Sequence, residues 1–68
     1  MRFVFHKLDD RWHWKLRDSN GGTAAMNAIG YARLANMVQV LRRIFRTSDR
    51  LTLAVDREYA RTLRKEQT

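Results

Sequence analysis

The sequence predicts an α+β fold, with an antiparallel sheet of three to four strands packed on one main amphipathic helix and a short helix near the C-terminal end. Two patterns carry this prediction. Residues 11–17 alternate strictly between apolar and polar positions, which is the period of a half-buried strand, and residues 2–8 are rich in strand-forming residues. From Tyr31 to Arg46 the apolar residues recur at helical spacing instead. The chain has 68 residues and no Cys, so we expect one domain with one core and no disulfide.

The clearest local signal is a hairpin of two strands. Residues 11–17 alternate strictly and place three apolar side chains on one face: Trp12, Trp14 and Leu16. Residues 2–8 form the partner strand, and Asp9-Asp10 is the turn between them. This turn sets three cross-strand pairs: Phe5 with Trp14, Phe3 with Leu16, and His6 with His13. A slip of one residue would set the phenylalanines beside charged side chains, so the hydrophobic pattern selects this register and places both tryptophans in the core.

A third strand follows the turn-forming residues 18–22, over residues 23–28. A loop of three or five residues would turn three residues toward the tryptophans: Ala24, Met26 and Ala28. A two-residue Asn-Gly turn would instead turn Ala25 and Asn27 to that face. We favour the odd loop because Met26 is then buried.

The main helix is expected between residues 31 and 46. Its apolar arc contains Leu34, Met37, Val38, Leu41, Ile44 and Phe45, and the opposite arc contains Asn36, Gln39, Arg42, Arg43 and Arg46. Its start is located only within a few residues, because no Ser, Thr or Asp stands at a capping position.

After a break at residues 47–49, the alternation over residues 51–55 predicts a fourth strand. Asp56 would then cap a short C-terminal helix over residues 56–66. The predicted domain therefore spans residues 1–68, with its core in 3–55. The short helix has a narrow apolar edge, so it must dock on another surface.

Four motifs along residues 3–46 follow one another in a characteristic order: Phe3-x-Phe5, Trp12-x-Trp14-x-Leu16, Asn20-Gly21, and Gly30-Tyr31 before the helix. In this order they resemble the YegP-like family of small bacterial proteins. The resemblance implies three antiparallel strands and a helix, in tandem copies or in single copies that pair as dimers, and it implies no active site. Ala32 departs from the family's usual Ser or Thr, and residues 56–68 lie outside its pattern.

A second, local resemblance concerns residues 50–64, which are similar to the strand and first helix of a ribbon-helix-helix DNA-binding protein. In that family, paired strands enter the major groove. The resemblance would make three positions groove-facing: Arg50, Thr52 and Ala54. The second helix of that family is missing, so we keep the likeness as a local pattern only.

Several chemistries are disfavoured by the residues present. The pair His6 and His13 lacks a third metal ligand, and the two serines fall in turns without a patterned base. Gly21-Gly22 lacks the spacing of a phosphate-binding loop. We therefore expect no enzyme, no catalytic residue, no metal, no cofactor and no small-molecule substrate.

The charge points to an acidic partner. The chain has 14 Lys and Arg against 7 Asp and Glu, and residues 21–50 hold five Arg but only one Asp. A partner-binding face is expected on the main helix: Arg42, Arg43 and Arg46, with Gln39 beside them. The same arginines also complement the helix dipole, which is a purely structural reason for them.

We therefore expect a cytoplasmic, non-catalytic homodimer that binds nucleic acid or nucleoprotein. No apolar run approaches the length of a membrane span, so no membrane partner is expected. The alternative is a small regulator or inhibitor, of the kind phages and mobile elements encode, which binds a host protein through a sheet edge or the C-terminal helix. Steep salt dependence would favour nucleic acid.

Overall fold

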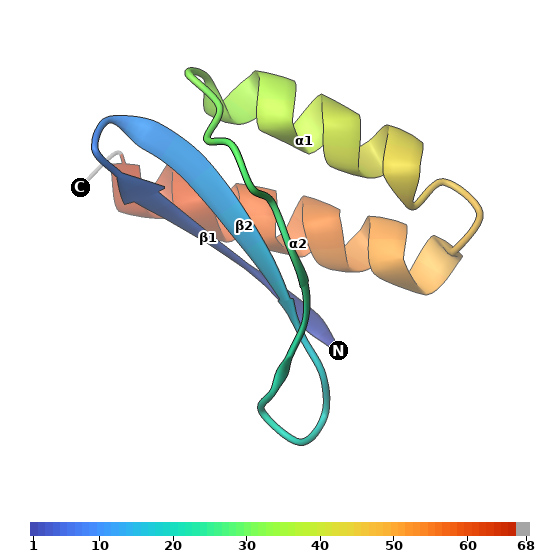
Figure 1. The fold of residues 1–68 in the computed structure, drawn as a ribbon. Helices are drawn as coiled ribbons and strands as arrows, with labels where there is room; N and C mark the ends of the chain where they lie inside the picture. The colour runs from blue at the N-terminus through green and yellow to red at the C-terminus, as the bar shows by residue number, and fades with distance from the viewer. Residues whose placement is uncertain (67–68) are drawn as a thin grey trace.

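A computed structural model describes residues 1–66 of the chain. The elements are β1 (Arg2–Leu8), β2 (Arg11–Arg17), β3 (Thr23–Met26), α1 (Leu34–Ile44) and α2 (Asp49–Glu66). The strands form one antiparallel sheet in the order β1-β2-β3, and both helices pack on the same face of it (Figure 1). The predicted α+β fold is confirmed, with three strands and not four. Gln67 and Thr68 of the predicted domain lie outside the described residues.

The hairpin of β1 and β2 has the predicted register. Phe5 pairs with Trp14, Phe3 with Leu16 and His6 with His13. Asp9 and Asp10 both have positive φ, 53° and 63°, as a two-residue type I′ turn requires. Asp tolerates this left-handed conformation better than most residues. The turn chemistry and the hydrophobic pattern therefore select the same pairing.

The loop before β3 has an odd number of residues, five (18–22), as favoured, but the prediction for Met26 is wrong. The Asp18 amide donates to the Gly22 carbonyl at 2.9 Å, and Gly21 takes a φ of 85° between them. A β-bulge beside Leu16 then adds one residue to the third strand, so that Ala25 pairs with Leu16. This shift turns Ala25 toward the core and leaves Met26 58% exposed on the other face. Ala24 and Ala28 are also exposed.

Helix α1 lies within the predicted range and has no side-chain hydrogen bond at its N-cap, Arg33. Three residues of its apolar arc are buried: Met37, Val38 and Leu41. Phe45 follows the helix and packs edge-on against Phe3 and Trp14, with ring centroids 5.4 and 6.0 Å apart. Ile44, at the margin of the arc, faces solvent, which the sequence analysis did not predict.

The predicted fourth strand over residues 51–55 is wrong, because α2 is one helix of 18 residues that includes them. Its N-cap is Ser48, whose Oγ accepts a hydrogen bond from the Leu51 amide at 3.2 Å; Asp56 lies inside the helix. The ribbon-helix-helix interpretation loses its strand for the same reason. The second helix is therefore long and begins seven residues earlier than predicted, at Asp49.

The core lies between the sheet and the two helices, and its buried apolar residues are Phe3, Phe5, Trp12, Trp14, Leu16, Met37, Val38, Leu41 and Val55. Both tryptophans are buried in it, as predicted. Helix α2 packs on β1 of its own chain. The docking surface that this segment was expected to need is provided by β1 of its own chain.

Candidate functional site

The predicted partner-binding residues of α1 lie together on its outer side. Gln39, Arg42 and Arg43 are exposed, and Arg46 is exposed in the turn that follows the helix. The spacing of three or four residues places Gln39, Arg42 and Arg43 on one side of the helix, away from the buried Met37 and Leu41. Three of the four predicted residues therefore share one side of α1 and Arg46 follows two residues after its end; these four residues are called the α1 basic face.

Arg42 is the one member of this face with an ionic partner among residues 1–66. Its Nη2 lies 2.9 Å from Oδ1 of Asp56 on α2, and its Nε donates to the same oxygen at 3.0 Å. Both side chains are 46% exposed. An exposed pair contributes about 0–1 kcal/mol, so the bridge joins the two helices without supplying much stability. Arg43 and Arg46 have no such ion pair among residues 1–66.

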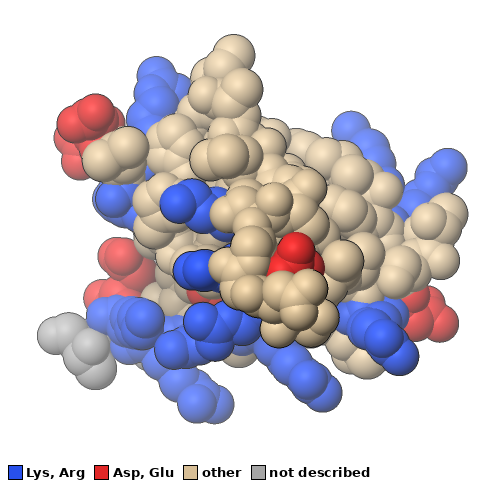
Figure 2. Space-filling view, turned by 60° about the horizontal axis from the view of Figure 1, so that its bottom comes forward, with Lys and Arg blue, Asp and Glu red and all other residues tan. Residues whose placement is uncertain are grey.

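A second row of arginines runs along α2, and the sequence analysis missed it. Arg50, Arg57, Arg61 and Arg64 fall within about 60° of one another around the helix. Val55 lies on the opposite side, in the core. Figure 2 shows several Lys and Arg side chains in a row along the lower edge of the molecule. The spacing of Arg57, Arg61 and Arg64 was present in the helix predicted over residues 56–66, and the expected strand over residues 51–55 separated only Arg50 from them.

The outer face of the sheet is basic as well. His6 and His13 stack with ring centroids 5.4 Å apart, and Lys15 follows two residues after His13 on the same face of β2. Burial, then the nearby charge of Lys15 and then that of His13, lower the pKa of His6 below its ordinary value. A Cβ added at Gly30 would lie 2.8 Å from His13 Nε2, so the chain passes directly over this ring. Part of the sheet's outer face is therefore already covered.

This histidine pair does not complete a metal site. Within the described part of the chain, no group of three or more His, Asp or Glu side chains could hold an ion. Two imidazoles alone fall short of the three or four protein ligands of a typical zinc centre. The stacked pair is accounted for by the cross-strand register of the hairpin.

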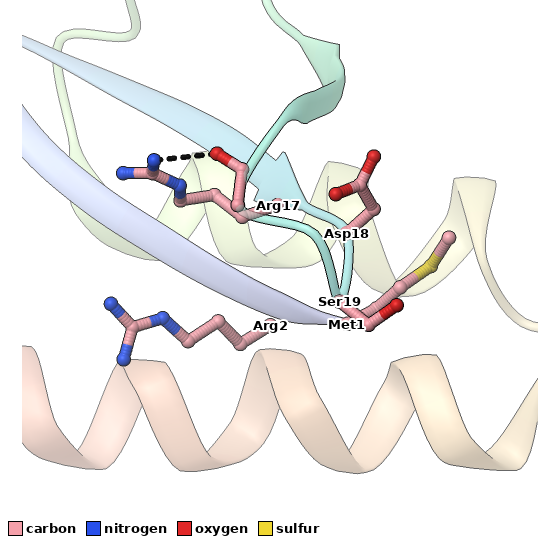
Figure 3. A pocket seen from close by; sticks show the side chains of 6 residues that line it. Met1, Arg2, Arg17, Asp18 and Ser19 are labelled. Carbon is pink, nitrogen blue, oxygen red and sulfur yellow. Dashed lines mark hydrogen bonds between the residues drawn. The ribbon is translucent and has the colours of Figure 1, made fainter.

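A wide, open hollow of about 520 Å³ lies where β1 begins and β2 ends. Figure 3 shows Arg2 and Arg17 extending along the same side of this region while Asp18 points the other way. Arg17 donates from Nη2 to the Gly21 carbonyl at 2.7 Å, and the Asp18 carboxylate accepts from the amides of Asn20 and Gly22. These polar groups stabilise the loop before β3, so this hollow follows from the loop's own hydrogen bonding.

Comparisons of the chain with protein-family models, with curated proteins and with solved structures give no match. The resemblance to the YegP-like family therefore stays a prediction. Neither described helix has the length and apolar character needed to cross a membrane.

Proposed function

We propose that this protein is a non-catalytic module that binds an acidic macromolecule, nucleic acid or nucleoprotein, through the α1 basic face. The observation that carries the proposal is the exposure of Arg43 and Arg46 without a carboxylate partner among residues 1–66, beside an Arg42 that shares one with α2. Guanidinium groups bind phosphate in two-pronged geometry and stay charged at any physiological pH. With nucleic acid as the partner, we place the protein in the cytoplasm.

The arginine row of α2 supports the same proposal. The two helices pack on each other and on one face of the sheet, so their outer sides form one layer. Asp56 is held by Arg42 between the two rows. Positive side chains spread over such a layer attract a polyanion from several positions at once, and phosphate contacts release counterions.

The test is the affinity of a short DNA duplex and a short single-stranded RNA, measured by fluorescence anisotropy, for two triple variants. Replacing Arg42, Arg43 and Arg46 by Gln should weaken binding at least tenfold, since each lost charge-assisted contact is worth about 1.5–3 kcal/mol. The matched control removes three charges from the sheet side: Arg11→Gln, Lys15→Gln and Arg17→Gln. Equal affinity of the two variants, with both folded by circular dichroism, would contradict the assignment to α1.

We also propose a homodimer that forms through the free edge of β3. The outer edge of β1 is already met by α2, because the Phe5 amide donates to Glu58 Oε2 at 2.9 Å. On the other side, β3 ends the sheet, with Met26 and the 80% exposed Ile29 near its outer edge. An unpaired edge with exposed apolar side chains is suited to pairing with a second copy.

Light scattering at micromolar concentration tests the dimer. The expected mass is twice the 8.1 kDa of one chain, and Met26→Lys should reduce it toward one chain. A wild-type mass of one chain would contradict the dimer. The same free edge keeps the alternative function open, in which β3 pairs with a host protein. Retention of a partner after nuclease treatment at high salt would favour that alternative.

A further inference from the structure

A smaller hollow lies between the N-terminal end of β1 and the middle of α2, on the opposite side of α2 from the Arg42–Asp56 bridge. Its volume is about 180 Å³. Arg2 lines it from β1, and Arg57 and Arg61, one helical turn apart, line it from α2. Three arginines from distant parts of the chain therefore line one small space.

These arginines have no compensating partner in residues 1–66. The one carboxylate that lines the hollow belongs to Glu58, and its Oε2 accepts the hydrogen bond from the Phe5 amide at 2.9 Å. No ion pair joins Glu58 to an arginine among the described residues, whereas Arg42 has Asp56 at 2.9 Å. Like charges that line one small space repel one another, and an anion between them would offset the repulsion.

The backbone of β1 adds a donor to the same place. In an antiparallel sheet, the residues of a non-hydrogen-bonded pair direct their backbone N–H and C=O groups away from each other's strand. Phe5–Trp14 is such a pair, because the backbone of Trp14 bonds to Asn27 on the β3 side. Phe3–Leu16, two residues along the strands, is a pair of the same type. The outward amide of Phe5 is taken by Glu58. Two residues earlier, the amide of Phe3 points outward by the same alternation, and Phe3 is one of the residues that line the hollow.

We propose that this hollow binds a phosphate group, held by Arg2, Arg57 and Arg61 together with the Phe3 amide. A tetrahedral anion with several acceptor oxygens matches a set of converging guanidinium groups and one N–H. The space equals about six water molecules at ~30 Å³ each, which suits one phosphate group but not a whole nucleotide. The rest of the ligand lies outside the hollow, over the helical layer.

This inference deepens the proposed function and rests on it for the carrier of the phosphate, which is the backbone of the nucleic acid. It assigns the α2 side of the helical layer a defined phosphate position in addition to the α1 basic face. Arg50 and Arg64 lie in the same row of α2 but do not line the hollow. They therefore provide a control that removes the same charge from the same helix.

The first measurement is an NMR titration with inorganic phosphate against sodium chloride of equal ionic strength. We expect saturable shifts of the Phe3, Arg57 and Arg61 amides in the wild type. The double variant Arg57→Gln with Arg61→Gln should lose saturation, while Arg50→Gln with Arg64→Gln should keep it. Absence of saturable shifts in the wild type, or equal phosphate affinity of the two folded variants, would overturn the proposal.

The second measurement uses a short DNA duplex and separates this inference from the proposed function. We expect the Arg57 and Arg61 variant to bind the duplex about tenfold more weakly than the Arg50 and Arg64 variant. If the duplex binds both variants equally and phosphate gives no saturable shift, the hollow is not a phosphate site, although nucleic-acid binding stands. If phosphate saturates the hollow but the wild type does not bind the duplex, the phosphate site stands and the proposed function is wrong.

Discussion

Replacing Trp14 by Ala should remove most of the stability of this domain. Trp14 is 7% exposed and lies at the centre of the aromatic core. Its ring centroid is 5.9 Å from that of Phe3 and 6.0 Å from that of Phe45, which meets it at 89°. The indole therefore contacts both the neighbouring strand and the segment that ends α1, so its loss separates sheet from helix.

The expected cost follows from burial. A buried Trp replaced by Ala costs about 3–5 kcal/mol, of which each aromatic pair accounts for about 0.5–1.5 kcal/mol. A domain of this length has a total free energy of unfolding of roughly 3–10 kcal/mol. At about 4–8 °C for each kcal/mol, the melting temperature should fall by at least ~12 °C. If the loss is at the upper end of this range and the wild-type stability at the lower end, Trp14→Ala is unfolded at room temperature.

Circular dichroism melting and urea titration measure this effect. Trp14→Phe keeps an aromatic ring in the same site and should lose clearly less than Trp14→Ala. Leu53→Ala, at an exposed position of α2, should change the melting temperature little. A Trp14→Ala protein that melts within a few degrees of the wild type would refute the placement of this side chain in the core.

Three further predictions concern single contacts. Glu58→Ala should lower the free energy of unfolding by about 1–3 kcal/mol, because it leaves the Phe5 amide without its acceptor. Glu58→Gln keeps an acceptor oxygen and should retain most of the wild-type stability. Equal urea midpoints of wild type and Glu58→Ala would contradict this. Ser48→Ala should cost about 1 kcal/mol by removing the N-cap of α2, measured in the same titration against Ser48→Asp as the conservative control. The lowered pKa of His6 means that the folded state favours the neutral imidazole. The contribution of His6 to the free energy of unfolding is therefore fully present above pH 6.5 and decreases as the pH falls from there through the lower pKa of the folded state. In NMR titrations, Lys15→Gln should move the pKa of His6 back toward 6.5.

The first hairpin could be predicted because two independent signals agree. Alternation over residues 11–17 and a two-residue Asp9-Asp10 turn demand the same register, and only that register buries the aromatic side chains together. The bulge that follows could not be predicted. It adds one residue beside Leu16, no residue type marks it, and that single residue is enough to turn Met26 to solvent.

Helix α2 shows why short apolar patterns are ambiguous. Leu51, Leu53 and Val55 alternate like a strand, but Leu51, Val55, Tyr59 and Thr62 also recur at helical spacing on one face. Ser48 as the N-cap and the docking of α2 against β1 together favour the helix over the strand. The docking is a tertiary contact, which the local sequence does not show.

One part of the candidate site could be predicted from the sequence and another part could not. Most of the α1 basic face could be predicted, because Gln39, Arg42 and Arg43 belong to one helix and share one side of it, and Arg46 follows two residues after its end. The Arg42–Asp56 bridge and the hollow of Arg2, Arg57 and Arg61 could not, because each joins elements that are distant in the sequence and meet only when α2 packs on its neighbours.

The salt dependence of duplex affinity tests the central claim, nucleic-acid binding by the α1 basic face, most directly. Each phosphate contact contributes a slope of about −0.9 to the plot of log affinity against log salt, so three arginines predict a wild-type slope of roughly −2.7 or steeper. Replacing Arg42, Arg43 and Arg46 by Gln should make this slope shallower by the contribution of two to three phosphate contacts, about 1.8 to 2.7. An affinity that does not change with salt, or a triple variant with the slope of the wild type, would contradict the account.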